Sequence, residues 1–269
     1  MPADRLIAAF DNARKNGRVG FIPYITAGDP DLAACASVVD ALSRAGADVI
    51  ELGVPFSDPI ADGPINQRAA ERALASGTTL DGILNAVAAM RKGGRKIPIV
   101  LFTYFNPIHK MGTNVFCRRA AEAGVDGALI VDLPPEEAGE YRTAAKAADI
   151  GAVFLASPTT TDERLALIGE ASTGFVYYVS RMGVTGVSAS ISASLEEELA
   201  RVKKITRRPV AVGFGISTPE QAAFAAKNAD AVVVGSALVR MLAEDGAGGI
   251  SKMEKLAAGI SKALRKEKA

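Results

Sequence analysis

The sequence contains few of the residues on which several catalytic and metal-binding classes depend. Among 269 residues there are one histidine, two cysteines and no tryptophan. With His109 as the only histidine, Ser-His-Asp catalysis and histidine-rich metal sites are disfavoured, and we expect His109 to be a loop or helix-start residue. Cys35 and Cys117 are far apart and in no metal-like spacing, so we expect two buried packing residues in a reduced, cytoplasmic protein.

Net charge and long apolar segments are also scarce. The net charge is +1, so nothing indicates a nucleic-acid or membrane-surface partner. We find no apolar run long enough to span a bilayer. The first ten residues lack the basic start and long apolar core of a signal peptide.

What the chain does have is a regular alternation of apolar, strand-like runs with Ala-rich amphipathic segments. The predicted strands are 19–27, 48–53, 97–103, 127–132, 151–156, 175–180, 209–213 and 231–235. Eight strands alternating with helices in a chain of about this length predict an α/β fold, the (β/α)8 TIM barrel. A doubly wound open sheet is the alternative, although it normally has fewer strands. No linker or low-complexity tract divides the chain, so we predict a single barrel domain over residues 1–269.

Two helices are expected in addition to the regular barrel. An N-terminal helix at about residues 3–15 would cover the bottom of the barrel. An added helix fits after strand two, because 65–76 and 80–91 both have helical patterns.

Helix-start signals precede two of the predicted helices. Asp29-Pro30 places a capping side chain before a first-turn proline. Thr160-Thr-Asp-Glu163 is a capping-box pattern. Both indicate helices that begin immediately afterwards.

The most informative residue is Glu51, a carboxylate in the run Asp48-Val-Ile-Glu-Leu-Gly-Val54, which otherwise reads as a strand buried on both faces. An ionised carboxylate without partners there loses its solvation at a large cost. Its presence therefore indicates a use, such as proton transfer with a raised pKa. Asp62 follows in a Gly- and Pro-rich loop, and the two carboxylates suggest an acid/base pair. The alternatives are a core ion pair for Glu51 and ordinary turn chemistry for Asp62.

Glycines cluster after the last three predicted strands. Gly183-Val-Thr-Gly186 follows strand six, Gly213-Phe-Gly215 ends strand seven, and Gly235-Ser236 ends strand eight before a helix. Barrel enzymes often bind a substrate phosphate with the loops after strands seven and eight and a helix N-terminus, so these segments predict a phosphate site. The alternative is that the glycines only relieve crowding at strand ends.

Aromatic side chains fall at or near several strand ends, namely those of Tyr24, Phe102, Tyr104 and Tyr177. Each alone could be barrel core. Together with a phosphate site they could form a flat apolar slot beside a phosphorylated tail. Asp132, after strand four, could line this slot or, as we prefer, cap the next helix.

The segment from Met182 to Ser194 is rich in Gly and Ser and has the composition of a mobile lid that excludes water, or of a plain surface loop. No lysine ends a predicted strand, which disfavours a Schiff-base aldolase. Clustered metal ligands are also missing from the sequence, which disfavours a metal-dependent aldolase.

Four longer motifs lie in order along essentially the whole chain: Phe21-Ile-Pro-Tyr-Ile-Thr-Ala-Gly-Asp-Pro30, Ile50-Glu-Leu-Gly-Val-Pro-Phe-Ser-Asp-Pro-Ile-Ala-Asp-Gly-Pro64, Ser180-Arg-Met-Gly-Val-Thr-Gly186 and Gly213-Phe-Gly-Ile-Ser217. Together they resemble the tryptophan synthase α subunit family, and the motif around Glu51 is highly specific. The resemblance implies a (β/α)8 lyase that cleaves indole-3-glycerol phosphate into indole and glyceraldehyde 3-phosphate. It also implies no cofactor in this subunit, and a β-subunit partner that carries pyridoxal phosphate in an α2β2 complex.

The resemblance further implies roles for individual positions. Glu51 matches the family's general acid/base, Asp62 the loop carboxylate that stabilises positive charge on the ring nitrogen, and Thr185 the lid threonine that bonds this aspartate. Four positions match the family's phosphate-binding residues: Gly186, Gly215, Gly235 and Ser236. Phe214, next to Gly215, is also expected to contact the substrate. Tyr24 and Phe102 match apolar positions around the indole, and Tyr177 matches a tyrosine beside the reacting groups. At the position of Phe102 the family often has Leu or Met. Asp58-Pro59 and the segment from Asn106 to Lys110 match regions that face the β subunit.

Other functions remain open on the sequence alone. Another phosphate-binding barrel enzyme, an isomerase or a synthase, would carry different residues on strands one and two. A regulatory binding subunit would bind ligand only to switch its partner, but intact Glu51 and Asp62 argue against lost catalysis. A free-standing lyase that releases indole is the remaining alternative.

Overall fold

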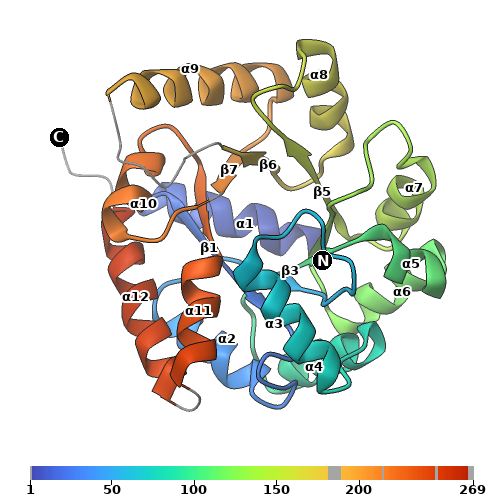
Figure 1. Ribbon diagram of the computed structural model, residues 1–269. Coiled ribbons are helices and arrows are strands. Elements are labelled where there is room, and N and C mark those ends of the chain that lie inside the picture. The colour runs from blue at the N-terminus through green and yellow to red at the C-terminus, as the bar shows by residue number, and fades with distance from the viewer. Residues whose placement is uncertain (1, 181–188, 214, 246–247, 266–269) are drawn as a thin grey trace.

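The computed structural model describes residues 2–180, 189–213, 215–245 and 248–265. Within them, eight parallel strands close into a barrel in sequence order (Figure 1). They are β1 (Gly20–Thr26), β2 (Ile50–Gly53), β3 (Ile99–Thr103), β4 (Gly127–Ile130), β5 (Gly151–Ala156), β6 (Val176–Val179), β7 (Val210–Gly213) and β8 (Ala231–Val234). The predicted (β/α)8 barrel is confirmed, and the open sheet is excluded because β1 pairs with both β2 and β8.

Helices surround the barrel, and both predicted additions are present. The described helices are α1 (Pro2–Lys15), α2 (Cys35–Arg44), α3 (Pro64–Ala75), α4 (Leu80–Lys92), α5 (Phe105–Met111), α6 (Thr113–Ala123), α7 (Gly139–Ala147), α8 (Asp162–Ala171), α9 (Ala189–Thr206), α10 (Pro219–Ala226), α11 (Ser236–Asp245) and α12 (Gly249–Ala263). The N-terminal helix is α1. Between β2 and β3 there are two helices, α3 and α4, so the added helix lies where the sequence predicted it.

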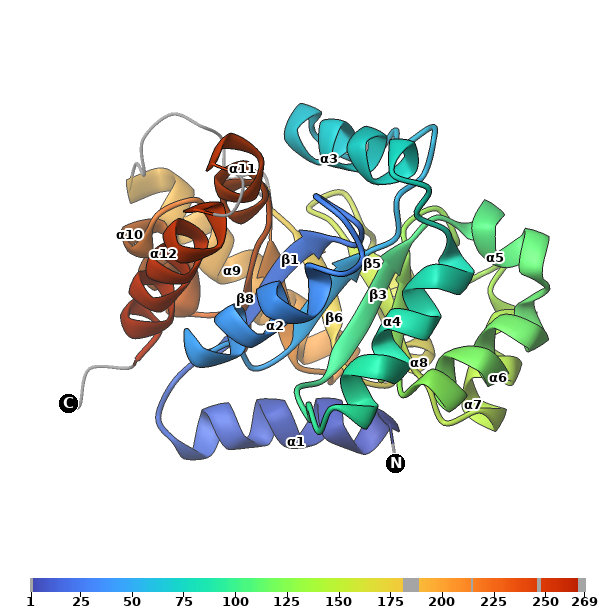
Figure 2. The same cartoon turned by 90° about the horizontal axis from the view of Figure 1, so that it is seen from below.

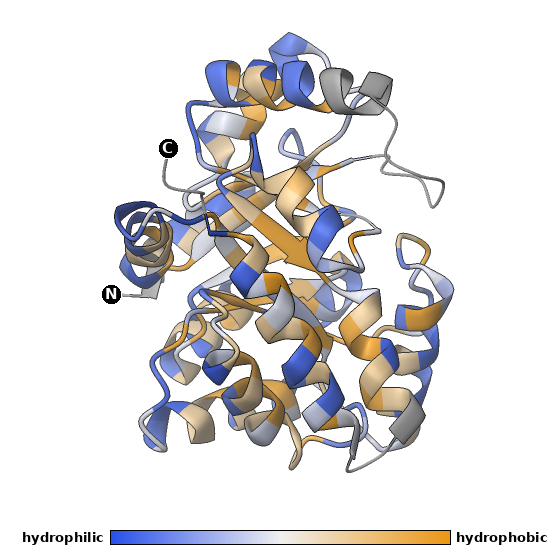
Figure 3. Ribbon diagram, turned by 90° about the vertical axis from the view of Figure 1, so that its left-hand side faces the viewer, coloured by the Kyte–Doolittle hydropathy of each residue, from blue (hydrophilic) through white to orange (hydrophobic). Residues whose placement is uncertain are grey.

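The strands are largely apolar, as burial on both faces requires, and Glu51 in β2 is the charged exception. Successive β1 side chains alternate between two clusters: Phe21 packs with the surrounding helices, whereas Ile22 packs inside the barrel. Figure 3 shows the result, with apolar strands at the centre and hydrophilic residues on the outer sides of the helices. Side chains of one parity along each strand therefore fill the interior or line its open end.

One end of the barrel is closed by α1. Leu6 of this helix is fully buried, and an added Cβ at Gly127 or Gly151 would lie only 3.0 or 2.9 Å from its Cδ1 atom. The rings of Phe10 and Phe175 are 5.2 Å apart beside it. Figure 2 shows α1 at this end and α3 at the opposite end. A site inside the barrel must therefore open on the side of α3.

Three local predictions about helix ends were wrong. Helix α2 begins at Cys35, and the Asp29–Pro30 peptide bond is cis. The Asp29 carboxylate does not cap α2, because it is held by Arg72 of α3 at 2.7 Å. The cap of α8 is Thr161 rather than Thr160, since its side chain accepts the N–H of Arg164.

His109 lies in the last turn of α5 rather than at a helix start. Cys35 and Cys117 are free and buried, as predicted, and burial raises the pKa of their thiols to about 11 and about 12. Among the described residues, no group of three His, Cys, Asp or Glu could hold a metal ion. None of the helices in the described part of the chain has the length and apolarity to cross a membrane.

Candidate active site

Strand β2 carries Glu51 into the barrel. Val49 belongs to the interior cluster, and side chains two residues apart on a strand share a face. Glu51 is 1% exposed, and its Oε1 atom has no hydrogen-bond partner. Burial, reinforced by the charge of Asp62, raises the pKa of this carboxyl to about 8. The group is therefore largely protonated at neutral pH and can both deliver a proton and take one back.

Asp62 lies in the loop between β2 and α3, directly before the N-terminus of the helix. The hydroxyl of Tyr104 donates to its Oδ2 atom at 2.9 Å, and the side chain of Asn66 also hydrogen-bonds it. Burial raises the pKa of the Asp62 carboxyl above its ordinary value, although these two hydrogen bonds oppose the rise. Because an anion is stabilised by donors and by a helix N-terminus, Asp62 is the carboxylate better suited to remain charged.

The loop that carries Asp62 is fixed from two sides. Tyr104, at the end of β3, accepts the N–H of Ala61 at 3.0 Å, and its ring stacks on Phe56 at 5.0 Å. Gln67 of α3 donates to the carbonyl oxygen of Asp62 at 2.9 Å. In the sequence, Tyr104 is recognisable only as a strand-end aromatic, and no local signal indicates that its hydroxyl holds Asp62.

Tyr24 and Tyr177 stand beside the carboxylates. Burial, then the charge of Glu51, raises the pKa of Tyr177, and burial, then the charge of Asp62, raises the pKa of Tyr24. Two glycines make room for the rings: a Cβ on Gly53 would lie 2.2 Å from the hydroxyl of Tyr24, and one on Gly213 2.2 Å from that of Tyr177. For these two glycines, relief of crowding is the physical reason.

The apolar part of the site lies around the ring of Phe102. This ring meets Tyr24 edge to face, with centroids 5.4 Å apart. Three further partly buried side chains pack on the interior cluster, those of Val131, Leu155 and Val179. Sequence analysis missed them, although the period of two, counted from Leu129, Val153 and Tyr177, would have placed them on the same face.

The predicted phosphate end lies at the carboxyl ends of β7 and β8, which are neighbours in the barrel. Gly235 follows β8, and Ser236 opens α11. Gly215 has φ +78°, a conformation that glycine adopts without strain. An added Cβ on Gly235 would be 3.4 Å from the Cβ of Tyr24, so this end adjoins the aromatic part of the site.

Several predicted residues fall elsewhere. Thr185, Gly186 and Phe214 lie outside the described residues. Of the predicted lid, residues 182–188 lie outside the described residues, and α9 begins at Ala189. Asp132 does not cap the next helix: its Oδ1 atom accepts the N–H of Phe105, the first residue of α5, at 2.7 Å.

The comparisons with known proteins agree with one another. The family model described as Tryptophan synthase alpha chain matches residues 10–267. The tryptophan synthase alpha chain of Phenylobacterium zucineum (strain HLK1) is 48% identical over 276 residues, which cover 100% of both chains. That of Caulobacter sp. (strain K31) is 52% identical over 239 residues, 89% of this chain and 87% of the relative.

Two solved structures are similar over nearly the whole chain. The structure of Mycobacterium tuberculosis tryptophan synthase has a TM-score of 0.88 and 40% identity, and covers 98% of this chain and 99% of its own. Tryptophan synthase subunit alpha from Legionella pneumophila str. Paris has a TM-score of 0.87 and 38% identity, and covers 97% of this chain and 98% of its own.

Proposed function

The chain belongs to the tryptophan synthase alpha chain family, and we propose that Glu51 and Asp62 carry out its reaction. It is a lyase that cleaves indole-3-glycerol phosphate into indole and glyceraldehyde 3-phosphate. The observation that carries the assignment of the residues is Glu51: a buried carboxyl with an unpaired oxygen and a pKa of about 8, facing a second carboxylate.

The chemistry requires one proton to be added and another to be removed. The protonated Glu51 donates its proton to C3 of the indole ring, which leaves a positive charge on the ring nitrogen. Asp62 faces this charge and stabilises it where it develops. The Glu51 carboxylate then takes the proton from the hydroxyl on the carbon attached to C3. The C–C bond breaks, its electron pair returns to the ring, and an aldehyde forms, so Glu51 ends the cycle protonated.

Substrate binding fixes the bond that breaks. We assign the phosphate to Gly215, Gly235 and Ser236, together with Gly186, and the indole ring to Tyr24, Phe102 and Tyr177. We also assign Phe214 to substrate contact and Thr185 to a hydrogen bond with Asp62. Holding the two ends of the substrate apart places the scissile bond near Glu51, which contributes to the rate through orientation.

We also propose a β-subunit partner that carries pyridoxal phosphate and receives the indole, whereas this subunit needs no cofactor. One of the similar solved structures is the subunit alpha of a tryptophan synthase, a designation that implies a further subunit. In this chain, Ile60, beside the Asp58-Pro59 turn, is a large apolar side chain that is 88% exposed. Such exposure is common for single residues, but here it falls in a segment that the family resemblance assigns to the β-facing surface.

The test is an assay of the purified chain with indole-3-glycerol phosphate, with and without a β subunit, in which indole and glyceraldehyde 3-phosphate are measured. Slow cleavage that accelerates with the partner supports both the lyase activity and the complex. Cleavage of equal rate in the absence and presence of the partner would leave a free-standing lyase. Full activity of Glu51→Gln would overturn the proposed role of this residue.

A further inference from the structure

Two buried side-chain oxygens near the open end of the barrel have no hydrogen-bond donor: Oε1 of Glu51 and Oδ1 of Asn66. Buried polar atoms in folded proteins are nearly always paired, so each such atom calls for an explanation. Glu51 is explained by the proposed reaction. Asn66, in the first turn of α3, has no role so far.

The position of the Asn66 amide follows from its neighbour. It hydrogen-bonds the carboxylate of Asp62, which can only accept, so the amide must present its N–H group to that side. Its Oδ1 atom, bonded to the same carbon as the amide nitrogen, is buried without a donor. The adjacent Ile65 and the next-turn Ala69 pack with Tyr24, so this part of α3 lies against the aromatic part of the site.

The proposed function supplies a donor of the right kind, and this inference rests on it. Asn66 neighbours Asp62 at the start of α3, and Ile65 and Ala69 beside it also pack with Val239 of α11, the helix that opens at the phosphate end. In the proposed reaction, the substrate group next to Asp62 is the indole ring, whose one N–H is the donor that Asp62 faces. We propose that Oδ1 of Asn66 accepts a hydrogen bond from the ring N–H of the substrate and shares this donor with Asp62.

The shared hydrogen bond stabilises the substrate most at the step in which C3 is protonated. When C3 is protonated, the ring nitrogen becomes cationic, and its N–H becomes a stronger donor to both acceptors. A structural role would require a donor for Oδ1 within the chain. Because this acceptor is unpaired, an apolar residue of similar shape is expected to leave the ligand-free protein equally stable or more stable.

The experiment compares two matched ligands by calorimetric titration. One is indole with a phosphorylated three-carbon chain at C3, and the other is its benzofuran counterpart, which has oxygen in place of the ring N–H. For Asn66→Leu we expect the affinity for the indole ligand to fall about tenfold, while the affinity for the benzofuran ligand does not change. Thermal unfolding of the same variant should show no loss of stability.

Two control variants separate indirect effects. Tyr104→Phe removes the donor to Asp62 and the acceptor of the Ala61 N–H, but no acceptor assigned to the substrate, so it measures what a change at the Asp62 loop does to the preference for the N–H. Gln67→Leu removes support for the backbone of the loop and should weaken both ligands alike. The proposal requires a larger loss of the N–H preference in Asn66→Leu than in Tyr104→Phe.

Other results would overturn the proposal. Equal weakening of both ligands by Asn66→Leu, no weakening of either, or a loss of preference equal to that of Tyr104→Phe would each do so while the proposed function stands. If the unaltered protein bound neither ligand, the proposed function would fall first, and this inference with it. Should Asn66→Leu fail to fold, Asn66→Ala removes the same acceptor and is subject to the same criteria.

Discussion

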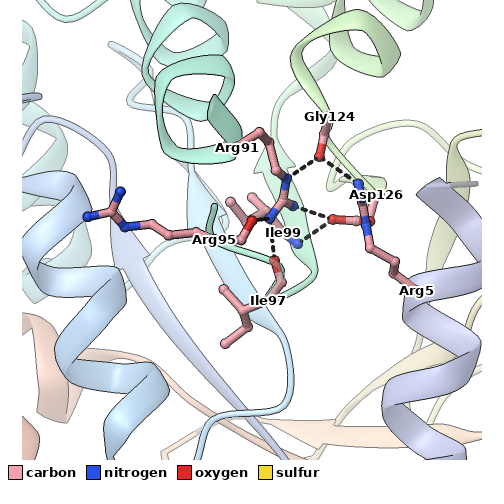
Figure 4. A network of polar contacts seen from close by, with 7 residues as sticks. All are labelled: Arg5, Arg91, Arg95, Ile97, Ile99, Gly124 and Asp126. Atoms are coloured by element: carbon pink, nitrogen blue, oxygen red, sulfur yellow. Dashed lines mark hydrogen bonds and ion pairs between the residues drawn. The ribbon is translucent and has the colours of Figure 1, made fainter. Parts of the chain in front are cut away.

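The two ends of the barrel treat a buried carboxylate in opposite ways. Asp126, directly before β4, is fully buried, and its oxygens accept from Arg5 at 2.5 Å, from Arg91 at 2.6 Å and from the N–H of Ile99 at 2.7 Å (Figure 4). At the other end, Glu51 is 1% exposed, and its Oε1 atom has no partner.

The difference follows from what each end is for. A buried charge that is paired and fully hydrogen-bonded ties elements together, and Asp126 joins α1, α4 and the start of β3 and β4. A buried carboxyl without a cation binds its proton more tightly, which costs stability in the ionised state but supplies an acid at neutral pH. In barrels of this kind, the carboxyl ends of the strands carry the chemistry and the amino ends carry the stability.

The largest expected effect is on turnover, at the catalytic end. Glu51→Gln keeps the size of the side chain but cannot transfer the proton, so we expect kcat to fall by ~10²- to 10⁴-fold. The stability of the variant should be equal or greater, because no ionisable group remains in the buried position. Turnover and urea unfolding check both parts, and a variant that loses stability along with its activity would contradict the separation of the two ends.

At the end of the barrel that α1 closes, we expect a loss of stability without a loss of turnover. Asp126→Leu leaves the guanidinium of Arg91 buried without its carboxylate, so the free energy of unfolding should fall by ~3–5 kcal/mol. The folded fraction should keep its kcat. A matched control is Asp40→Asn, which breaks a partly exposed ion pair with Arg95 at the surface and should cost only ~0–1 kcal/mol. Equal losses in the two variants would show that the Asp126 network is no more important than a surface pair.

The pH dependence of stability sharpens the comparison. The folded-state pKa of Glu51 is about 8, above the ordinary value of 4.5, so the folded chain holds a proton that the unfolded chain releases. The stability from this group is complete below pH 4.5 and is lost as the pH rises towards 8. Between pH 6 and pH 7, the unaltered protein should therefore lose ~1.4 kcal/mol relative to Glu51→Gln. Parallel urea-unfolding results for the two proteins over this interval would contradict the raised pKa.

How much of this was predictable depends on how far apart the partners are in the sequence. The strands could be predicted because burial on both faces leaves continuous apolar runs, and Glu51 was recognised because a charge interrupts one of them. The Asp126 network could not be predicted, because Arg5 and Asp126 are 121 residues apart and meet only when α1 closes the barrel. Local signals can also be taken by a distant partner, as when Arg72 holds the Asp29 carboxylate that was expected to cap α2.

The candidate site was predictable to the same degree. Glu51 and Asp62 were identified by their residue types in an unusual setting, whereas Asn66 reads as an ordinary polar residue of an amphipathic helix. The glycines were seen, but the sequence could not tell phosphate contact from crowding. For Gly213, one of these glycines, the answer is the ring of Tyr177, and that contact exists only between neighbouring strands of the closed barrel.

The smallest expected effect concerns a single tyrosine hydroxyl at each end. Tyr104→Phe removes the donor to Asp62, so the pKa of this carboxyl should rise and kcat/KM should fall by about tenfold or less, with little change in stability. The matched variant is Tyr141→Phe, which removes a buried bond to the carbonyl oxygen of Ala128 at 3.0 Å. It should cost ~1 kcal/mol of stability and leave kcat/KM unchanged. Steady-state kinetics across pH and urea unfolding of both variants give the four values. A larger loss of stability in Tyr104→Phe than in Tyr141→Phe would contradict the comparison. It would show that hydrogen bonds do not divide between activity at one end and stability at the other, as the carboxylates of Glu51 and Asp126 do.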